Sequence, residues 1–252
     1  MFQEWQTTKH SEVTHTNAIR LISETWAQNA NIPRVKARDL LISIRNRNAF
    51  IIVDPQSHIV RWYGEGIWKQ QHDPDLLDNG RVLLFDNQGL PNSPYGHSRV
   101  LEVDLFTHEI YWQYKGTDED SYFDSLIRGA QHRLPNSNTP ITESQGGRLF
   151  EATREQKIVW EYYNPDRAEY EGKHLRAMMT QAERIPTDVV RFSIISSLLC
   201  GIIVVQQHRP GLYRPHHHYR RRQALCSAGY GGRRRLADRA FVSVLFAISF
   251  EE

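Results

Sequence analysis

A hairpin that ends in tryptophan recurs three times along the chain, and this repeat constrains the fold more than any other feature. The three copies are NAFIIVDPQSHIVRWYGEG (48–66), SRVLEVDLFTHEIYWQYKG (98–116) and GRLFEATREQKIVWEYYNP (147–165). Each has an alternating apolar strand, a polar turn and a second short strand. The tryptophans Trp62, Trp112 and Trp160 are therefore 50 and 48 residues apart. Self-similarity at such a period is typical of repeat folds.

Shorter strands are expected between the hairpins, in DLLISIRN (39–46), GRVLLFDN (80–87) and NTPITES (138–144), where Pro140 removes one backbone donor. Each period then holds about four short strands and no strong amphipathic helix, which is typical of a propeller blade. A β-sandwich is the alternative, but its strands would not repeat one tryptophan-terminated hairpin three times. We predict an all-β fold, a β-propeller with about three to four blades. Because closed propellers have about 4–8 blades, we expect blades to be missing on the N-terminal side.

The composition of the chain changes near Pro186. Residues 1–185 read as the partial propeller, whereas residues 186–252 form a tail that we expect to be irregular or helical. The tail has ten Arg and no Lys, with the runs HHH (216–218) and RRR (220–222 and 233–235). Such a stretch can bind nucleic acid, an anion or a metal. A change of reading frame gives the same abrupt change, and we assign the tail no function.

Export and membrane signals are weak in this chain. The N-terminus, MFQEWQTTKHSEV, lacks the apolar core of a signal peptide. The longest apolar stretch, 192–205, is shorter than the ~20 residues that span a bilayer. Cys200 and Cys226 are a single pair that does not fix the redox compartment. The net charge of +2 argues neither for nor against nucleic acid as a partner.

Four polar residues lie where a propeller assembles its ligand site. In this fold the first strand of each blade borders a central channel, so residues at the ends of these strands share one funnel. His15 and Asn17 in THTNAI, Arg45 in ISIRNRN and His72 in QQHDPDLLDNG lie at the start or end of predicted inner strands. Taken singly, each is more often a structural, turn or solvated surface residue. Taken together, in successive segments, they predict a site.

The order of these motifs resembles the arylsulfotransferase family. HTNAI, DLLISIRNRN with IIVDPQSHIVRW, and QQHDPDLLDNGRVLLFDNQG resemble successive family motifs, and the resemblance covers residues ~14 to 186. The family implies a six-bladed propeller that moves a sulfuryl group from an aryl sulfate to a phenol by a ping-pong reaction. The resemblance implies that His72 is the nucleophile, that His15 and Asn17 bind the anion, and that Arg45 is the family arginine.

The chemistry of these side chains suits those roles. Imidazole has a pKa of ~6.5, so much of it is neutral and nucleophilic near pH 7. Attack on sulfur gives a sulfohistidine and divides one difficult displacement into two easier ones. Arg45, His15 and Asn17 can donate hydrogen bonds to the sulfuryl oxygens. The arrangement needs no metal, and we expect no cofactor.

Other polar residues lack such support. We interpret the tryptophan series as blade-packing residues, and Asp86 and Asn87 as turn residues that can also shape the funnel. The histidines that we interpret as structural are His97, His108, His132 and His174.

Three functions remain open from the sequence. The first is an aryl-sulfate sulfotransferase, or a truncated and inactive piece of one. The second is a propeller module that binds a sulfated or phosphorylated ligand without turnover, and the third is a quinoprotein-like propeller with a redox cofactor. We expect small-molecule aryl sulfate and phenol as partners, no nucleic acid, and self-association through open blade edges. The family resemblance implies an extracytoplasmic location, and we expect membrane contact only through a missing N-terminal anchor.

Overall fold

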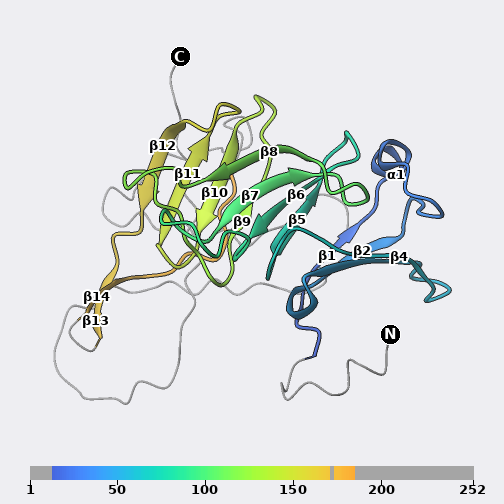
Figure 1. The fold of residues 1–252 in the computed structure, drawn as a ribbon, viewed down its shortest axis with the longest axis horizontal. Coiled ribbons are helices and arrows are strands. Elements are labelled where there is room, and N and C mark those ends of the chain that lie inside the picture. The colour runs from blue at the N-terminus through green and yellow to red at the C-terminus, as the bar shows by residue number, and fades with distance from the viewer. Residues whose placement is uncertain (1–12, 171–172, 185–252) are drawn as a thin grey trace, which may run out of the picture.

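Three four-stranded antiparallel sheets lie next to one another in chain order in a computed structural model, which describes residues 13–170 and 173–184 (Figure 1). Each sheet has its strands in sequence order, as a propeller blade does. The first sheet consists of β1 (Thr16–Leu21), β2 (Leu40–Ile44), β3 (Ala49–Val53) and β4 (Val60–Glu65). The second consists of β5 (His72–Leu76), β6 (Val82–Asp86), β7 (Arg99–Val103) and β8 (Ile110–Lys115). The third consists of β9 (Ala130–Gln131), β10 (Thr139–Glu143), β11 (Arg148–Ala152) and β12 (Ile158–Tyr163).

The tryptophan-terminated repeat is visible in the register of the outer strands. The three tryptophans pair across the sheet with Ile52, Glu102 and Glu151 in turn, and each sheet has a register shift immediately after that residue. The first two connecting turns are alike, since the carboxylates of Asp54 and Asp104 each accept two backbone N–H groups. The expectation of a β-propeller fold is therefore confirmed by three copies of one bulged hairpin.

The core lies between the sheets. One cluster of buried side chains joins the first and second sheets and includes Phe50 and Leu84, and a second joins the second and third sheets and includes Phe85 and Phe150. Neighbouring residues of β6 contribute to different clusters because successive side chains of a strand point to opposite faces. The middle sheet is thus covered on both faces, and all five residues of β6 are buried.

The first strands of the sheets lie side by side. β1 contacts β5, and β5 contacts β9. β9 has only two residues, so it pairs with β10 through Ile141 and Thr142 alone. Pro140 falls at the end of this short ladder, where its carbonyl accepts the N–H of His132 (3.3 Å). The short ladder between β9 and β10 therefore needs no N–H from Pro140, so a proline fits in β10.

Two short helices interrupt the expected strand pattern. Helix α1 (Glu24–Ala30) follows β1; Ser23 caps its N-terminus, and Trp26 packs into the first core cluster. The 3-10 helix η2 (Arg45–Arg47) follows β2. Arg45 therefore lies at the end of the second strand of its sheet, and not at the end of an innermost strand as we expected.

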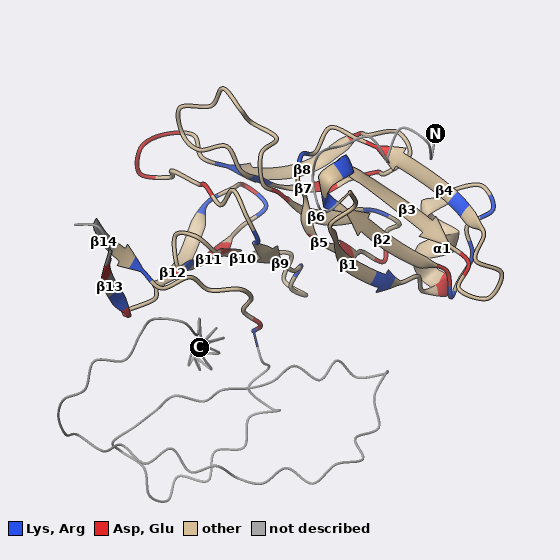
Figure 2. Ribbon diagram, turned by 90° about the horizontal axis from the view of Figure 1, so that it is seen from below, with Lys and Arg blue, Asp and Glu red and all other residues tan. Residues whose placement is uncertain are grey.

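A hairpin of β13 (Arg167–Tyr170) and β14 (Lys173–Arg176) projects away from the three sheets (Figure 1). Basic and acidic residues both occur in all three large sheets (Figure 2). No helix in the described part of the chain is long and apolar enough to cross a membrane. The tail 186–252, which we expected to be irregular or helical, lies outside the described residues.

Candidate functional site

The segment Gln70–His72, at the start of β5, is where the sequence-predicted site residues meet. A side-chain N–H of Arg45 donates to Oε1 of Gln70 (2.5 Å), and the amide of Asn17 donates to the carbonyl of Gln71 (2.7 Å). Nδ1 of His72 lies 3.0 Å from the carbonyl of Gln70. The N–H of Arg45 donates to the carbonyl of His15 (3.2 Å), which holds these two residues together. Two segments distant in sequence are therefore tied to one tripeptide.

Irregular backbone surrounds this tripeptide. The β1–β2 ladder shifts register between Thr16 and Ala18, around Asn17, and the β5–β6 ladder shifts between His72 and Asp75. Bulges of this kind change the direction of side chains and are common beside functional sites. Left-handed φ angles, which cost energy outside glycine, occur at His15, Asn48, Gln70, Asp73 and Arg128. The site is thus built on strained backbone that the flanking strands hold in place.

His72 is a half-buried histidine whose pKa lies below the usual value. Burial lowers the pKa of His72 most, because it disfavours the charged ring. The positive charges of Arg45 and His15 lower this pKa further, and hydrogen bonds to Asn87 and Gln70 partly offset these effects. The ring is therefore neutral near pH 7, and the side chains of Arg45 and His15 lie close enough to act on it.

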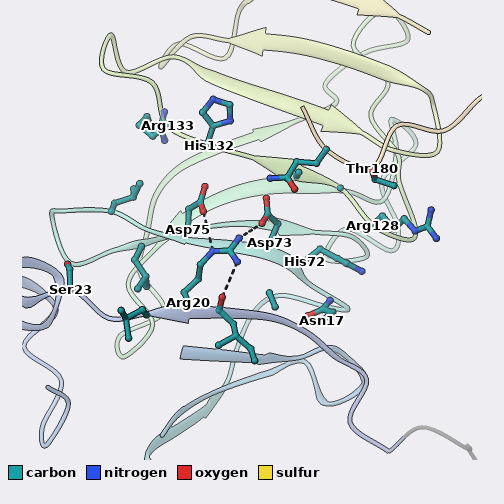
Figure 3. A pocket seen from close by; sticks show the side chains of 18 of the residues that line it. Asn17, Arg20, Ser23, His72, Asp73, Asp75, Arg128, His132, Arg133 and Thr180 are labelled. Carbon is teal, nitrogen blue, oxygen red and sulfur yellow. Dashed lines mark hydrogen bonds and ion pairs between the residues drawn. The ribbon is translucent and has the colours of Figure 1, made fainter. Parts of the chain in front are cut away.

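A cavity of about 1030 Å³ opens in front of His72 and Asn17 (Figure 3). Its walls come from β1, β5 and the segment around β9. Across the cavity, Arg20 of β1 donates to the carboxylates of Asp73 and Asp75 of β5. The negative charge of these two carboxylates is therefore balanced in part by Arg20, which reduces their repulsion of an anionic ligand beside His72.

The structure brings the four predicted residues into one neighbourhood but gives them different positions. Asn17 and His72 line the cavity. His15 and Arg45 are half-buried and are not part of its wall, although the charges of both act on His72. Asn17 already uses one amide N–H on the carbonyl of Gln71, and its Oδ1 is buried without a hydrogen bond from the described residues.

Residues beyond the four predicted ones contribute to the site. Asn87, which we interpreted as a turn residue that can also shape the funnel, is fully buried, and its Oδ1 lies 2.7 Å from Nδ1 of His72. Arg128 and His132 line the cavity, although we interpreted His132 as structural. One signal was present in the sequence, because the pair Gln71–His72 at the start of β5 recurs as Gln131–His132 in the next sheet.

In the part of the chain that the structure describes, no three His, Cys, Asp or Glu side chains come together in a way that could hold a metal ion. From other segments, the guanidinium of Arg45 and the imidazole of His15 act on His72 through their charge, and Oδ1 of Asn87 lies against its Nδ1. Guanidinium and imidazole N–H groups can bind and orient an anion.

Comparison with known proteins gives the family of the chain. A family model described as Arylsulfotransferase (ASST) matches residues 2–165, which is more than half of the chain. The chain belongs to the arylsulfotransferase family. The four predicted residues of this arylsulfotransferase-family chain, and Asn87, all fall within the match. No curated protein is similar enough to match it.

Solved structures resemble parts of this arylsulfotransferase-family chain. A protein of unknown function from Bacteroides caccae shares 15% identity with a TM-score of 0.37, over 49% of this chain and 45% of that one. Selenomethionine-substituted virginiamycin B lyase from Staphylococcus aureus shares 14% identity with a TM-score of 0.39, over 62% of this chain and 43% of that one. The chain therefore spans less than half the length of each of these structures.

Proposed function

We propose that this chain supplies the nucleophile of a sulfotransferase that moves a sulfuryl group from an aryl sulfate to a phenol. His72 carries the group as a sulfohistidine between the two half-reactions. Membership of the arylsulfotransferase family supports the class of reaction. The assignment of His72 rests on one observation, which is that a neutral imidazole lies on a cavity wall within the electrostatic reach of Arg45 and His15.

The proposed reaction has two matched displacements. In the first, a nitrogen lone pair of His72 forms a bond to sulfur while the bond from sulfur to the aryl oxygen breaks, and the electron pair leaves on that oxygen. In the second, the phenol oxygen attacks sulfur, the N–S bond breaks, and its electron pair returns to the ring. The phenol proton must be removed in this step, and the imidazole that is regenerated is a base able to accept it.

The polar side chains around His72 stabilise the negative charge of the transferred group. A sulfuryl group spreads negative charge over its oxygens, and fixed donors that hold this charge lower the barrier. Arg45 acts through its charge, and Asn17 acts through the amide N–H that Gln71 does not use. His15 adds a second cation when it is protonated. Removal of the Arg45 charge should therefore slow the transfer while the protein still folds.

The test is sulfuryl transfer from a chromogenic aryl sulfate to a phenol, followed by absorbance, with His72→Ala and His72→Asn beside the wild type. We expect both substitutions to abolish release of the chromogenic phenol. Mass spectrometry of the alkali-quenched protein should find one added sulfuryl group on the peptide that contains His72. Turnover that survives both substitutions would refute the nucleophile assignment.

The same experiment separates the transferase from a binding module. An aryl sulfate that binds to the wild type without turnover, detected by calorimetry, would favour a propeller module that recognises a sulfated ligand. His58→Ala is a matched control, because His58 is also a histidine but is exposed in the β3–β4 turn and does not line the cavity. The control should keep full activity.

A further inference from the structure

Asn87 follows β6 directly and is buried completely. Its side-chain nitrogen donates to the carbonyls of Ser125 (2.6 Å) and Arg128, both in the segment that leads to β9. Both donors of the amide are therefore used, and this fixes which end of the amide is the oxygen. Oδ1 of Asn87, which can only accept a hydrogen bond, lies 2.7 Å from Nδ1 of His72.

A second acceptor lies on the same ring nitrogen. The carbonyl of Gln70 is 3.0 Å from Nδ1 of His72. A carbonyl and an amide oxygen both require a donor, so Nδ1 of His72 carries the hydrogen. In a neutral imidazole only one nitrogen carries a hydrogen, and the lone pair is then on Nε2. No hydrogen bond from the described residues reaches Nε2, and the ring lines the cavity.

We propose that Asn87 is a positioning residue that holds His72 in the Nδ1–H tautomer and thereby makes Nε2 the nucleophilic atom. The inference deepens the proposed function and rests on it for its catalytic consequence. When Nε2 forms the bond to sulfur and the aryl oxygen leaves with its electron pair, the ring becomes cationic and keeps its Nδ1 hydrogen. Oδ1 of Asn87 and the carbonyl of Gln70 then accept a stronger hydrogen bond from that cation.

A purely structural role for Asn87 is the competing explanation. The same amide joins the β6 end of the second sheet to the loop before β9, through carbonyls 38 and 41 residues away. Loss of this connection would loosen the loop and lower activity without any effect on the tautomer. The two explanations differ in what they predict for the pKa of His72. Loosening of the loop alone would not shift this pKa in opposite directions in Asn87→Ala and Asn87→Asp.

The direct test is the tautomer of His72, measured by long-range ¹H–¹⁵N NMR on the full chain. The His72 signals are assigned by their absence in His72→Asn. We expect the Nδ1–H form in the wild type and a shift of about tenfold in the tautomer ratio toward Nε2–H in Asn87→Ala, since one hydrogen bond to Nδ1 is lost. Asn164→Ala is a matched control, because Asn164 is a buried asparagine that donates to the carbonyl of Ala177 and does not contact His72.

The pH dependence of transfer adds a second readout. The hydrogen bond from His72 to Asn87 raises the pKa of His72, so Asn87→Ala should move the acid limb of the pH–rate profile to lower pH. Asn87→Asp places a negative charge beside the ring and should move it to higher pH. The other charged groups near His72 are Arg45 and His15 of the first sheet and Arg128 in the wall of the cavity. These residues are not substituted in either variant, so the difference between the variants reports on position 87. We expect the plateau rate of Asn87→Ala to fall about 10- to 100-fold.

Each outcome decides the proposal. Opposite shifts of the acid limb, with an altered tautomer in Asn87→Ala and an unchanged one in Asn164→Ala, support it. An Nε2–H tautomer in the wild type overturns it, whether or not the protein transfers sulfuryl groups. If the wild type has no activity, the proposed function fails, and the tautomer comparison still tests the role of Asn87. If Asn87→Ala does not fold, the wild-type tautomer and the direction of the shift in Asn87→Asp decide.

Discussion

Glu143 is a buried carboxylate at the end of β10, and it makes the stability of the protein depend on pH. Its side chain is 8% exposed. Burial raises the pKa of Glu143 to about 7 from the usual 4.5, although the N–H of Asp124 (3.1 Å) and the charge of Arg148 act in the opposite direction. The closest approach of Arg148 to this carboxylate is 3.7 Å, too long for a strong hydrogen-bonded pair.

The sign of the effect follows from the direction of this change. A raised pKa in the folded state means that the folded protein holds a proton that the unfolded chain has already released. The contribution to stability is therefore complete below pH 4.5 and is lost as the pH rises through about 7. The interval from 4.5 to about 7 corresponds to roughly 3 kcal/mol of unfolding free energy.

Glu143→Gln should therefore stabilise the protein, but only at neutral and alkaline pH. Glutamine keeps an acceptor for the N–H of Asp124 and carries no charge. Urea unfolding followed by tryptophan fluorescence should give equal midpoints for the variant and wild type near pH 4.5. The variant should be more stable by up to roughly 3 kcal/mol at pH 8.

The control for this prediction is the other carboxylate that contacts Arg148. Glu161 lies 2.9 Å from this arginine and is 45% exposed. Glu161→Gln should change the unfolding free energy by less than about 1 kcal/mol, without a rise between pH 4.5 and 8. A stability difference between Glu143→Gln and wild type that stays constant over this range, or a destabilisation at pH 8, would refute the reasoning.

Three further predictions concern the contacts between blades and the site. Glu102→Gln leaves three arginines without their shared buried counter-charge and should destabilise the protein by about 3–5 kcal/mol in urea unfolding. Arg45→Ala removes a charge that lowers the pKa of His72, so the acid limb of the transfer reaction should move to higher pH, with a rate about 100-fold lower. Gly129→Ala should lower the thermal midpoint, because Gly129 has a φ of +121° and a Cβ there would lie 2.6 Å from the ring of Phe85.

Exposed residues provide controls for the Glu102 and Arg45 variants. Glu109→Gln removes an exposed carboxylate and should change the unfolding free energy by less than about 0.5 kcal/mol. Lys157→Ala removes an exposed cation in the β11–β12 turn and should leave the pH–rate profile unchanged. Equal losses in Glu102→Gln and Glu109→Gln would contradict the importance of the buried charge cluster.

The sequence contains enough information to predict the three hairpins, because strand alternation and turn chemistry are local. The apolar run in GRVLLFDN predicts a strand over 80–87, and β6 runs from Val82 to Asp86. The short helix α1 was not predicted, since seven residues give little periodicity and its stability comes from the burial of Trp26 in the core. The 3-10 helix at Arg45 was also missed, and this residue follows the second strand of its sheet and not an innermost strand.

The candidate site was predictable only in part, for a related reason. The motif around His72 can be read along the chain, whereas the role of Asn87 depends on carbonyls 38 and 41 residues further on. Asparagine after a strand is also common in turns, so its local pattern does not distinguish the two roles. Partners of this kind are set by the packing of one sheet on the next, which no local pattern records.

The site and the packing of the sheets depend on the same contacts. Asn17 and Arg45 reach the His72 segment from the first sheet, His72 and Asn87 belong to the second, and the carbonyl of Ser125 holds Asn87 from the loop that leads to the third. If the sheets separate, the side chains of Asn17 and Arg45 therefore move away from the His72 segment while the strands are still folded. The proposed transfer activity should accordingly be lost at lower urea concentrations than the β-sheet signal in circular dichroism, because the sheets are joined at the site by side-chain hydrogen bonds and not by a continuous backbone ladder.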